Sequence, residues 1–285
     1  MKAKLNKRVL RSFIKKALHE DVKDGDHTSR ACIPLRQKNQ AKLLVKDKGV
    51  LAGVEIAHEI FTYLDPKAKL EVILDDGTPA KYGDISYYLT CNSQALLMGE
   101  RLALNLMQRL SGVATLSRKF AEATKKYDVT ILDTRKTTPL LRFLEKWAVT
   151  VGGCSNYRDG LYDRIMIKDN HITAAGSITN AVAKVERYLK KNKKSLDMTV
   201  EVRHMKELRE VLKLSATPRV MLDNFEVADM KKAVKLVDGR LEVEASGGIK
   251  LNNVKAVAAT GVNFISVGAL THSAQSLDLS LKIVG

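Results

Sequence analysis

Polar and charged residues follow six short apolar segments in the second half of the sequence, and their types and spacing suit catalysis. The segments begin at Val129, Arg164, Met198, Arg219, Leu241 and Phe264. In a parallel barrel the carboxyl ends of the strands meet on one face, where active sites lie. A solvated loop does not need the same polarity at each repeat, so we expect the six ends to share one site.

Basic residues gather around the first two segments. Arg135 and Lys136 follow the first segment, Arg158 precedes the second, and Lys168 ends it. Arginine meets a carboxylate or phosphate through a planar fork, whereas lysine acts as a point charge. Crowded positive charge is unfavourable unless a ligand brings several negative charges, so the pattern predicts a pocket for a polyanion. A surface pair of Arg135 and Lys136 is the structural alternative.

Two carboxylates end the next two segments, Glu201 and Asp223. Such a pair can bind ribose hydroxyls, hold Mg²⁺ directly or indirectly, or stabilise positive charge that develops on a sugar. Two structural alternatives stay open: Glu201 forms a salt bridge with Arg203, or Asp223 and Asn224 cap a helix.

Small residues end the last two segments, at Ser246-Gly247-Gly248 and at Gly268. Barrel enzymes often bind phosphate at these strands through backbone N–H groups. A Ser-Gly-Gly sequence is a weak signal by itself, and its place after the fifth strand strengthens it. We therefore expect a phosphate to bind there.

The elements that position these residues follow a βα rhythm. The six segments begin 35, 34, 21, 22 and 23 residues apart, and most are followed by a helical pattern. This spacing predicts a parallel barrel or a doubly wound sheet. The first hundred residues mix a helix over 5–18 with short strands and further helices, which indicates an α+β layer. A long helical pattern covers 95–126, with an interruption expected at Ser111-Gly112.

The charge balance concerns partners rather than fold. The 285 residues carry 48 basic and 32 acidic side chains, a formal net charge of +16. Polyanionic small molecules and nucleic acid both suit this excess. The sequence has no helix-turn-helix, RNP-like or zinc-finger pattern and only 5% aromatic residues for stacking on bases. We therefore expect small polyanions and no nucleic acid.

Neither a membrane nor an oxidising compartment is indicated. The longest stretch without charge, 256–277, is interrupted by polar residues that a lipid-facing helix would rarely carry. The three cysteines form no metal-binding or CxxC pattern and suit a reducing compartment. We expect a cytoplasmic protein without membrane contact.

Motifs in a fixed order carry a family resemblance. They are Arg101-Leu-Ala-Leu-Asn105, Ser111-Gly112-Val-Ala-Thr115, Asp133-Thr-Arg-Lys-Thr-Thr-Pro139, Asn156-Tyr-Arg158, Ile167-Lys-Asp-Asn-His171, Glu201, Leu222-Asp-Asn224 and Glu244-Ala-Ser-Gly-Gly248. With this set the sequence closely resembles the nicotinate-nucleotide pyrophosphorylase (carboxylating) family, also called quinolinate phosphoribosyltransferases. The resemblance extends from about Glu20 to the last strand.

The resemblance implies an α/β fold in which an N-terminal α/β sandwich precedes an incomplete parallel α/β barrel. The sandwich would cover 1–110, the barrel would cover 111–273, and the tail 274–285 would return to the sandwich. It also implies a homodimer or hexamer whose pockets are shared between subunits, because Arg101 matches an arginine that the partner contributes in this family.

The implied reaction joins quinolinate to phosphoribosyl pyrophosphate and gives nicotinate mononucleotide, pyrophosphate and CO₂, with Mg²⁺ and no organic cofactor. The implied catalytic residues are Lys136, Glu201 and Asp223, the last two also holding the metal ion. The implied substrate contacts are Arg101, Arg135, Lys136, Tyr157, Arg158, Lys168, Ser246, Gly247, Gly248 and Gly268.

Two residues depart from the family pattern. Many members carry His where this chain has Tyr157, and many carry Gly where it has Leu140. A tyrosine can donate a hydrogen bond to a carboxylate but cannot become cationic near neutral pH. A related transferase acting on another anionic aromatic base is therefore the enzymatic alternative.

Overall fold

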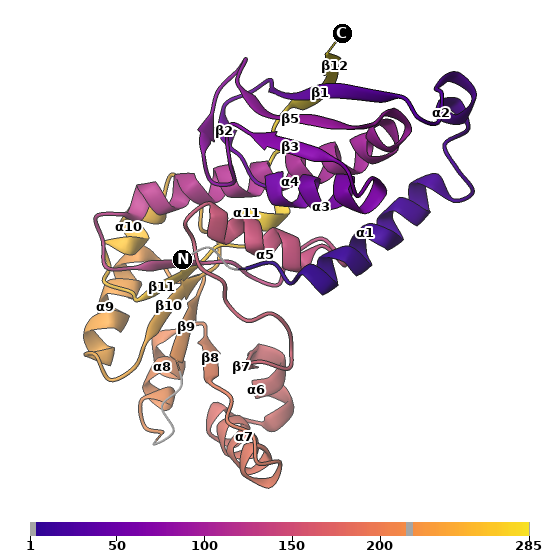
Figure 1. Cartoon of the computed structure of the whole chain (residues 1–285). Helices are drawn as coiled ribbons and strands as arrows, with labels where there is room; N and C mark the ends of the chain where they lie inside the picture. Colours follow the sequence, from indigo (N-terminus) through magenta and orange to yellow (C-terminus); the bar gives the residue numbers. More distant parts are fainter. Residues whose placement is uncertain (1–3, 215–218, 285) are drawn as a thin grey trace. The chain divides into compact units, whose positions relative to one another are not determined.

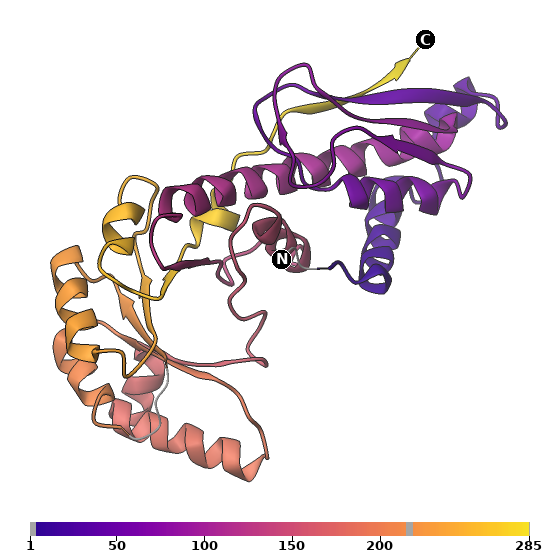
Figure 2. The same ribbon diagram turned by 60° about the vertical axis from the view of Figure 1, so that its left-hand side comes forward.

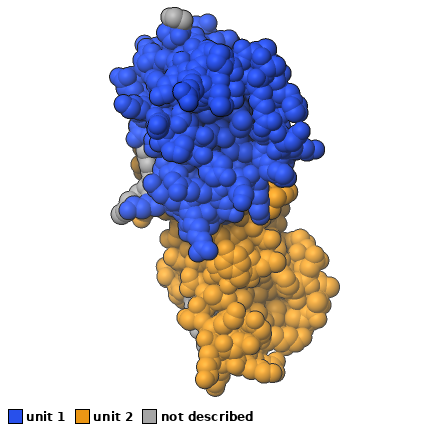
Figure 3. Space-filling model, turned by 45° about the vertical axis from the view of Figure 1, so that its right-hand side comes forward, with its two compact units in different colours: residues 1–118, 143–153, 273–285 blue, residues 119–142, 154–272 orange. Residues whose placement is uncertain are grey.

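The computed structural model describes residues 4–214 and 219–284, and these form two compact units (Figure 3). Unit 1 combines the chain up to residue 118 with 143–153 and the segment from 273 onward. Unit 2 combines 119–142 with 154–272. The ends of the predicted sandwich and tail, residues 1–3 and 285, lie outside the described residues.

Unit 1 is built on an antiparallel sheet. Its strands are β1 (Lys38–Val45), β3 (Lys69–Val72), β5 (Ile85–Asn92) and β12 (Leu279–Val284), in the order β12-β1-β5-β3. A second, two-stranded sheet pairs β2 (Gly49–Val50) with β4 (Pro79–Ala80). The C-terminal strand β12 pairs with β1 from Gln40 opposite Val284 to Val45 opposite Leu279. The last strand of the chain thus completes a sheet that the first strand begins.

Five helices belong wholly or mainly to unit 1. They are α1 (Lys7–Val22), α2 (His27–Cys32), α3 (Val54–Leu64), α4 (Ser93–Thr124) and α5 (Arg142–Val151). Helix α1 follows the predicted amphipathic pattern, because Leu10, Ile14 and Leu18 are buried one turn apart. Helices α3 and α4 lie along one face of the four-stranded sheet (Figure 1).

Helix α4 extends across the predicted boundary at residue 110. Helix α4 continues through Ser111 and Gly112, where we expected an interruption. A Cβ atom at Gly112 would lie 2.0 Å from the carbonyl oxygen of Gln275, so this glycine allows the returning tail to approach the helix. The Ser111 hydroxyl exchanges hydrogen bonds with the backbone of Ala52. The Ser-Gly pair is therefore a packing site within unit 1, and the predicted break in the helix is wrong.

Unit 2 is built on a parallel sheet. Its strands are β6 (Thr130–Leu132), β7 (Ile165–Ile167), β8 (Met198–Val202), β9 (Arg219–Asp223), β10 (Val243–Ser246) and β11 (Phe264–Ser266). Their order is β6-β11-β10-β9-β8-β7, so the six predicted segments form one sheet. The helices of this unit are α6 (Asp169–Ala175), α7 (Ile178–Lys191), α8 (Met205–Val211), α9 (Val227–Val237), α10 (Val254–Ala258) and α11 (Ala269–His272).

The barrel of unit 2 is incomplete. Strands β6 and β7 follow one another in the chain but form the two outer strands of the sheet, and no ladder joins them in the described residues. The sheet curves, with α7, α8 and α9 on its outer face (Figures 1 and 2). A sandwich with an antiparallel sheet and an incomplete parallel barrel confirm the predicted fold class. Among the described residues, no helix has the length and hydropathy needed to cross a membrane.

Candidate active site

The register of the parallel strands brings their carboxyl ends to one edge of the sheet. Ile167 of β7 lies opposite Val200, Val202 of β8 lies opposite Leu222, and Asp223 of β9 lies opposite Ser246. Because neighbouring strands run in step, the polar residues that follow them share this edge. The site below is built within unit 2 from these ends.

The loop after β6 is held by hydrogen bonds at several points. Asp133 is fully buried, and its Oδ1 accepts from the Tyr157 backbone N–H at 2.8 Å. The Thr271 hydroxyl donates to the Lys136 carbonyl oxygen at 2.8 Å. The Lys136 side chain is exposed, and its Cδ would lie 3.0 Å from a Cβ atom at Gly268. The stem of this lysine therefore lies over the glycine that follows β11.

Arg135 and Arg158 form a pair of cations beside this loop. Arg158 is 8% exposed and donates to the Arg164 carbonyl oxygen at 3.4 Å. Burial lowers the pKa of the Arg158 guanidinium, and the charge of Arg135 lowers it further. The Nε of Arg135 is buried and has no hydrogen-bond partner in the described structure. An unmet buried donor is costly, so this nitrogen favours an anionic ligand.

Lys168 and Glu201 form an ion pair between the ends of β7 and β8. The Lys168 Nζ lies 3.4 Å from Oε2 of Glu201, a residue that is 8% exposed. Burial raises the pKa of the Glu201 carboxyl, the Lys168 ammonium opposes this shift, and the Asp223 charge adds to it. The alternative bridge from Glu201 to Arg203 is not formed, because Arg203 pairs with Asp169 at 2.6 Å.

Asp223 ends β9 beside a strained residue. Asn224 has a positive φ of 56°, which asparagine tolerates better than most residues. Its Nδ2 donates to Asp223 Oδ2 at 2.9 Å, and its backbone N–H donates to the Ser246 carbonyl oxygen. Helix α9 has Glu226 at its N-cap, so Asp223 and Asn224 are not the helix cap considered as an alternative.

The Ser246-Gly247-Gly248 turn needs its glycines. Gly247 has a φ of 90° and Gly248 a φ of 61°, conformations that L side chains rarely adopt. A Cβ atom at Gly247 would lie 2.2 Å from Asn224 Oδ1. The Asn253 amide donates to the Gly248 carbonyl oxygen at 3.0 Å and closes the turn. Successive residues with positive φ expose backbone N–H groups in the manner of anion-binding turns.

Two carboxylates of the site, Glu201 and Asp223, suit a magnesium ion. No cluster of three or more His, Cys, Asp or Glu side chains suited to a metal occurs among the described residues. Glu201 and Asp223 are close enough for their charges to interact. Mg²⁺ is commonly held by one or two carboxylates together with substrate phosphates, and two such carboxylates are present.

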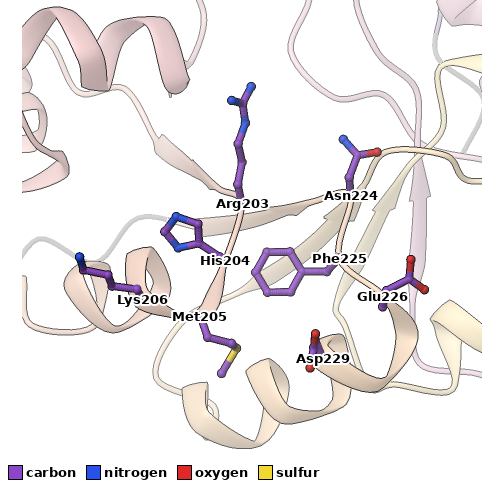
Figure 4. A pocket seen from close by; sticks show the side chains of 8 residues that line it. All are labelled: Arg203, His204, Met205, Lys206, Asn224, Phe225, Glu226 and Asp229. Atoms are coloured by element: carbon purple, nitrogen blue, oxygen red, sulfur yellow. The ribbon is translucent and has the colours of Figure 1, made fainter.

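A pocket of about 590 Å³ lies between the loops that follow β8 and β9 (Figure 4). It is lined by Arg203, His204, Met205, Lys206, Asn224, Phe225, Glu226 and Asp229. In Figure 4 the Phe225 ring projects from the β9 side toward the β8 side. The pocket adjoins Glu201 and Asp223 in sequence, and its lining mixes both signs of charge.

Two predicted site residues stand apart from this group. Arg101 is exposed on α4 in unit 1, whereas the other predicted contacts lie in unit 2. Tyr157 turns its hydroxyl toward Thr199 of β8 at 2.8 Å. Arg158 lies in the segment that precedes β7, and the remaining predicted residues lie at or just beyond the carboxyl ends of the parallel strands.

Sequence reasoning assigned no role to several supporting residues. Asp133 and Asn224 were part of recognised motifs, but only the structure shows the groups that they hold. Thr271 supports the Lys136 backbone from a position 135 residues away, which no local pattern reveals. For Thr199 a weak signal existed, because it precedes Glu201 by two positions in a strand and so shares its face.

Comparisons with known proteins match nearly the whole chain. The family model described as "Quinolinate phosphoribosyl transferase, C-terminal domain" matches residues 113–282, and the corresponding N-terminal domain model matches residues 26–111. The "Nicotinate-nucleotide pyrophosphorylase [carboxylating], chloroplastic" of Arabidopsis thaliana is 44% identical over 96% of this chain and 82% of its own length. The "Quinolinate phosphoribosyltransferase [decarboxylating] 1b" of Nicotiana tabacum is 43% identical over the same shares.

Solved structures resemble the chain over its whole length. The nicotinate-nucleotide pyrophosphorylase from Francisella tularensis has a TM-score of 0.91 and 34% identity, covering 99% of this chain and 98% of its own. The nicotinate-nucleotide pyrophosphorylase from Ehrlichia chaffeensis has a TM-score of 0.89 and 34% identity, covering 100% of both chains. The family models, the curated relatives and the solved structures thus show that the chain belongs to the quinolinate phosphoribosyl transferase family.

Proposed function

We propose that this chain transfers the phosphoribosyl group of phosphoribosyl pyrophosphate to quinolinate and removes one carboxylate as CO₂. The products are nicotinate mononucleotide, pyrophosphate and CO₂, which is a step of de novo NAD biosynthesis. The family and the names of the relatives support this reaction. The observation that carries it is the division of unit 2 into a cation cluster at Arg135 and Arg158 and a carboxylate pair at Glu201 and Asp223.

The cation cluster suits the two adjacent carboxylates of quinolinate. Arg135, Arg158 and Lys168 would bind these carboxylates, with Arg101 supplied by a second subunit. The unmet Nε of Arg135 supports this assignment, because a carboxylate would satisfy it. Two neighbouring guanidiniums repel one another until an anion lies between them, so the cluster is better suited to a dianion than to a neutral ring.

The carboxylate pair and the glycine-containing turn suit the phosphoribosyl donor. Glu201 and Asp223 would hold the ribose hydroxyls and the Mg²⁺ of the pyrophosphate, and Lys136 would face the donor. Backbone N–H groups near the residues that end the last two strands would bind the 5′-phosphate; these residues are Ser246, Gly247, Gly248 and Gly268. The positive φ of the two successive glycines supports a backbone phosphate site.

The chemistry then follows from the placement of opposite charges. The ring nitrogen of quinolinate attacks the anomeric carbon, and the bond to pyrophosphate breaks with its electron pair leaving on the pyrophosphate oxygen. Glu201 and Asp223 stabilise the positive charge that develops on the sugar. Glu201 and Asp223 would hold Mg²⁺, which would supply positive charge to neutralise the departing pyrophosphate.

Decarboxylation uses the charge created by the first step. The alkylated ring nitrogen is cationic, so it accepts the electron pair of the adjacent carbon–carboxylate bond as CO₂ leaves. A proton from solvent then replaces the carboxylate. Neither a Schiff base nor an organic cofactor is needed.

Shared sites in a homodimer or hexamer are part of the proposal. Arg101 is exposed on unit 1, which supports a role outside its own chain. Mixing Arg101→Ala subunits with Arg135→Ala subunits should restore part of the activity, because one pocket of each mixed dimer then has both arginines. Verified mixed dimers without activity would contradict shared sites.

We further place the protein in a reducing compartment, the cytoplasm. The three cysteines are odd in number and widely spaced in the sequence, which suits a reducing compartment. Fractionation of the source cells would test this placement. Recovery of the protein in an organelle or membrane fraction would contradict it.

The direct test of the proposed function is product release. Purified protein is mixed with quinolinate, phosphoribosyl pyrophosphate and Mg²⁺, and CO₂ and pyrophosphate are measured together. We expect both in equal amounts, and neither when the donor is omitted. Nicotinate replaces quinolinate in a control reaction. Pyrophosphate release with nicotinate but not with quinolinate would favour the related transferase on another aromatic acid.

A further inference from the structure

The Tyr157 side chain is enclosed by Thr199 of β8, Arg219 of β9 and Arg164, which directly precedes β7. Its hydroxyl lies 2.8 Å from the hydroxyl of Thr199, a residue with no exposed surface. The guanidinium carbons of Arg164 and Arg219 lie 5.4 Å and 5.8 Å from the centre of its ring. Cations at these distances attract an aromatic ring. The ring is thus held on its hydroxyl end and by two cations.

The backbone of Tyr157 is held at the other end of the residue. Its N–H donates to Oδ1 of Asp133 at 2.8 Å, and that carboxylate is fully buried at the end of β6. Arg135 lies two residues beyond Asp133, and Arg158 directly follows Tyr157. This hydrogen bond joins the two chain segments that carry the paired arginines. It acts together with backbone hydrogen bonds from the Asp133 N–H to the Ser155 carbonyl oxygen and from the Ser155 N–H to the Ile131 carbonyl oxygen.

The hydroxyl contact leads to the carboxylate side of the site. Thr199 and Glu201 are two positions apart in β8, so their side chains project from the same face of the strand. Both are buried. A shift of Tyr157 would change the packing of Thr199, and the same strand segment presents Glu201.

The hydroxyl stays protonated under working conditions. Burial raises the pKa of Tyr157, and the charge of Glu244 adds to this shift. A neutral hydroxyl can donate to Thr199 or accept from it, so the contact is kept at neutral pH.

We infer that Tyr157 is a positioning residue, which through Asp133 and Thr199 keeps Arg158 and Arg135 in register with Glu201. It acts on quinolinate through these neighbours and not through a hydrogen bond of its own to the substrate. This inference rests on the proposed function.

The test separates a positioning role from direct contact with the substrate. Tyr157→Phe removes only the hydroxyl, and Thr199→Val removes its partner with nearly the same shape. We expect each single change to raise the KM for quinolinate about tenfold. The KM of the double variant should exceed the larger of the two single-variant KM values by no more than about twofold. Thr199→Ser keeps a hydroxyl and should restore the wild-type KM. Tyr162→Phe, at an exposed tyrosine of the same loop, is the matched control.

Several results would overturn the inference. A loss with Tyr157→Phe that Thr199→Val does not reproduce would mean that the hydroxyl contacts quinolinate directly. Additive losses in the double variant, or changes in melting temperature without a change in KM, would also contradict it. The wild type is assayed in parallel: if it releases no CO₂ from quinolinate, the proposed function fails and the inference fails with it, whereas normal wild-type turnover with unaffected variants overturns the inference alone.

Discussion

The two halves of the barrel in unit 2 present different kinds of candidate binding group. Around β6 and β7 the proposed ligand groups are cationic side chains, Arg135, Arg158 and Lys168. Around β8 to β11 they are two carboxylates and the backbone of glycine-containing turns. The difference teaches that one parallel sheet can present cationic side chains and carboxylates side by side, and the Lys168–Glu201 ion pair at 3.4 Å lies where the two groups meet.

The halves also differ in how the groups are positioned. Strands β6 and β7 are the outer strands of the sheet, and the loops beside them are held by side-chain hydrogen bonds such as those of Asp133 and Thr271. Strands β8 and β9 lie within the sheet, so the ladder itself positions Glu201 and Asp223. Side-chain truncations should therefore have the larger effect on activity around β6 and β7. Around β8 to β11, changes that move the backbone should also lower activity.

The largest effect is expected for Arg135→Ala. Loss of this guanidinium removes a charge-assisted contact to a quinolinate carboxylate, and we expect kcat/KM for quinolinate to fall at least about a thousandfold. Steady-state kinetics with varied quinolinate measure this. Arg240→Ala, an arginine of unit 2 outside the site, is the control and should keep wild-type kinetics. Comparable losses of kcat/KM in both variants would show that Arg135 does not bind a quinolinate carboxylate.

Glu201→Gln tests the carboxylate half and should lower kcat about a hundredfold or more, because the developing sugar charge loses a partner. The thermal stability of Glu201→Gln should rise although its activity falls. Burial raises the pKa of Glu201 in the folded protein above its unfolded value, so the ionised carboxyl destabilises the fold at neutral pH. The neutral glutamine should therefore raise the melting temperature by about 2 °C.

The pH dependence of this gain gives a check on its cause. Below the unfolded pKa the wild-type carboxyl is protonated in both states, and the cost of ionisation is absent. The advantage of Glu201→Gln should thus be present at neutral pH and disappear as the pH falls through the raised pKa of Glu201. Calorimetry across acidic and neutral buffers measures it. A stability difference that grows toward acid would contradict the assigned cause.

A backbone change is expected to act in the second half. Gly247→Ala would place a Cβ atom 2.2 Å from Asn224 Oδ1 at a positive φ, so the turn must move. We expect the KM for phosphoribosyl pyrophosphate to rise at least about tenfold while quinolinate binding is kept. Gly239→Ala is the matched control, because Gly239 has a φ of 69° and no atom within 4 Å of the added Cβ. Equal kinetics in the two variants would argue against a phosphate-binding turn.

The smallest effect concerns Leu140. This residue is 88% exposed and has a φ of 64°, a left-handed conformation that costs a leucine about 1 kcal/mol. Leu140→Gly should raise the melting temperature by about 2 °C and leave the kinetics unchanged. Leu161→Gly, at an exposed leucine without positive φ, should not stabilise. A destabilised Leu140→Gly variant would show that the side chain makes contacts that outweigh the strain.

The sequence was sufficient for the barrel strands because their signal is local. Short β-branched runs at regular intervals predicted segments that begin within two residues of the observed strands. The polar residues at their ends could be grouped because parallel strands end on one edge. The same reasoning located Glu201 and Asp223 without any knowledge of side-chain contacts.

Contacts between segments far apart in the chain could not be predicted from the sequence. The Ser111-Gly112 pair looked like a helix interruption, but its meaning comes from Gln275, more than 160 residues away. The direction of Tyr157 is set by Thr199 and two arginines on other strands, so its residue type indicated only that it could donate a hydrogen bond. Local patterns therefore predict which residues reach the site edge and not how they are held.

Equilibrium binding of quinolinate tests the division of the barrel most directly. Isothermal titration is carried out with the wild type, Arg135→Ala and Glu201→Gln in the absence of the phosphoribosyl donor. We predict that Arg135→Ala raises the Kd at least about a hundredfold, whereas Glu201→Gln keeps it within about threefold of the wild type. Similar losses in both variants, or a larger loss in Glu201→Gln, would contradict a cationic half that binds the acid independently of the carboxylate half.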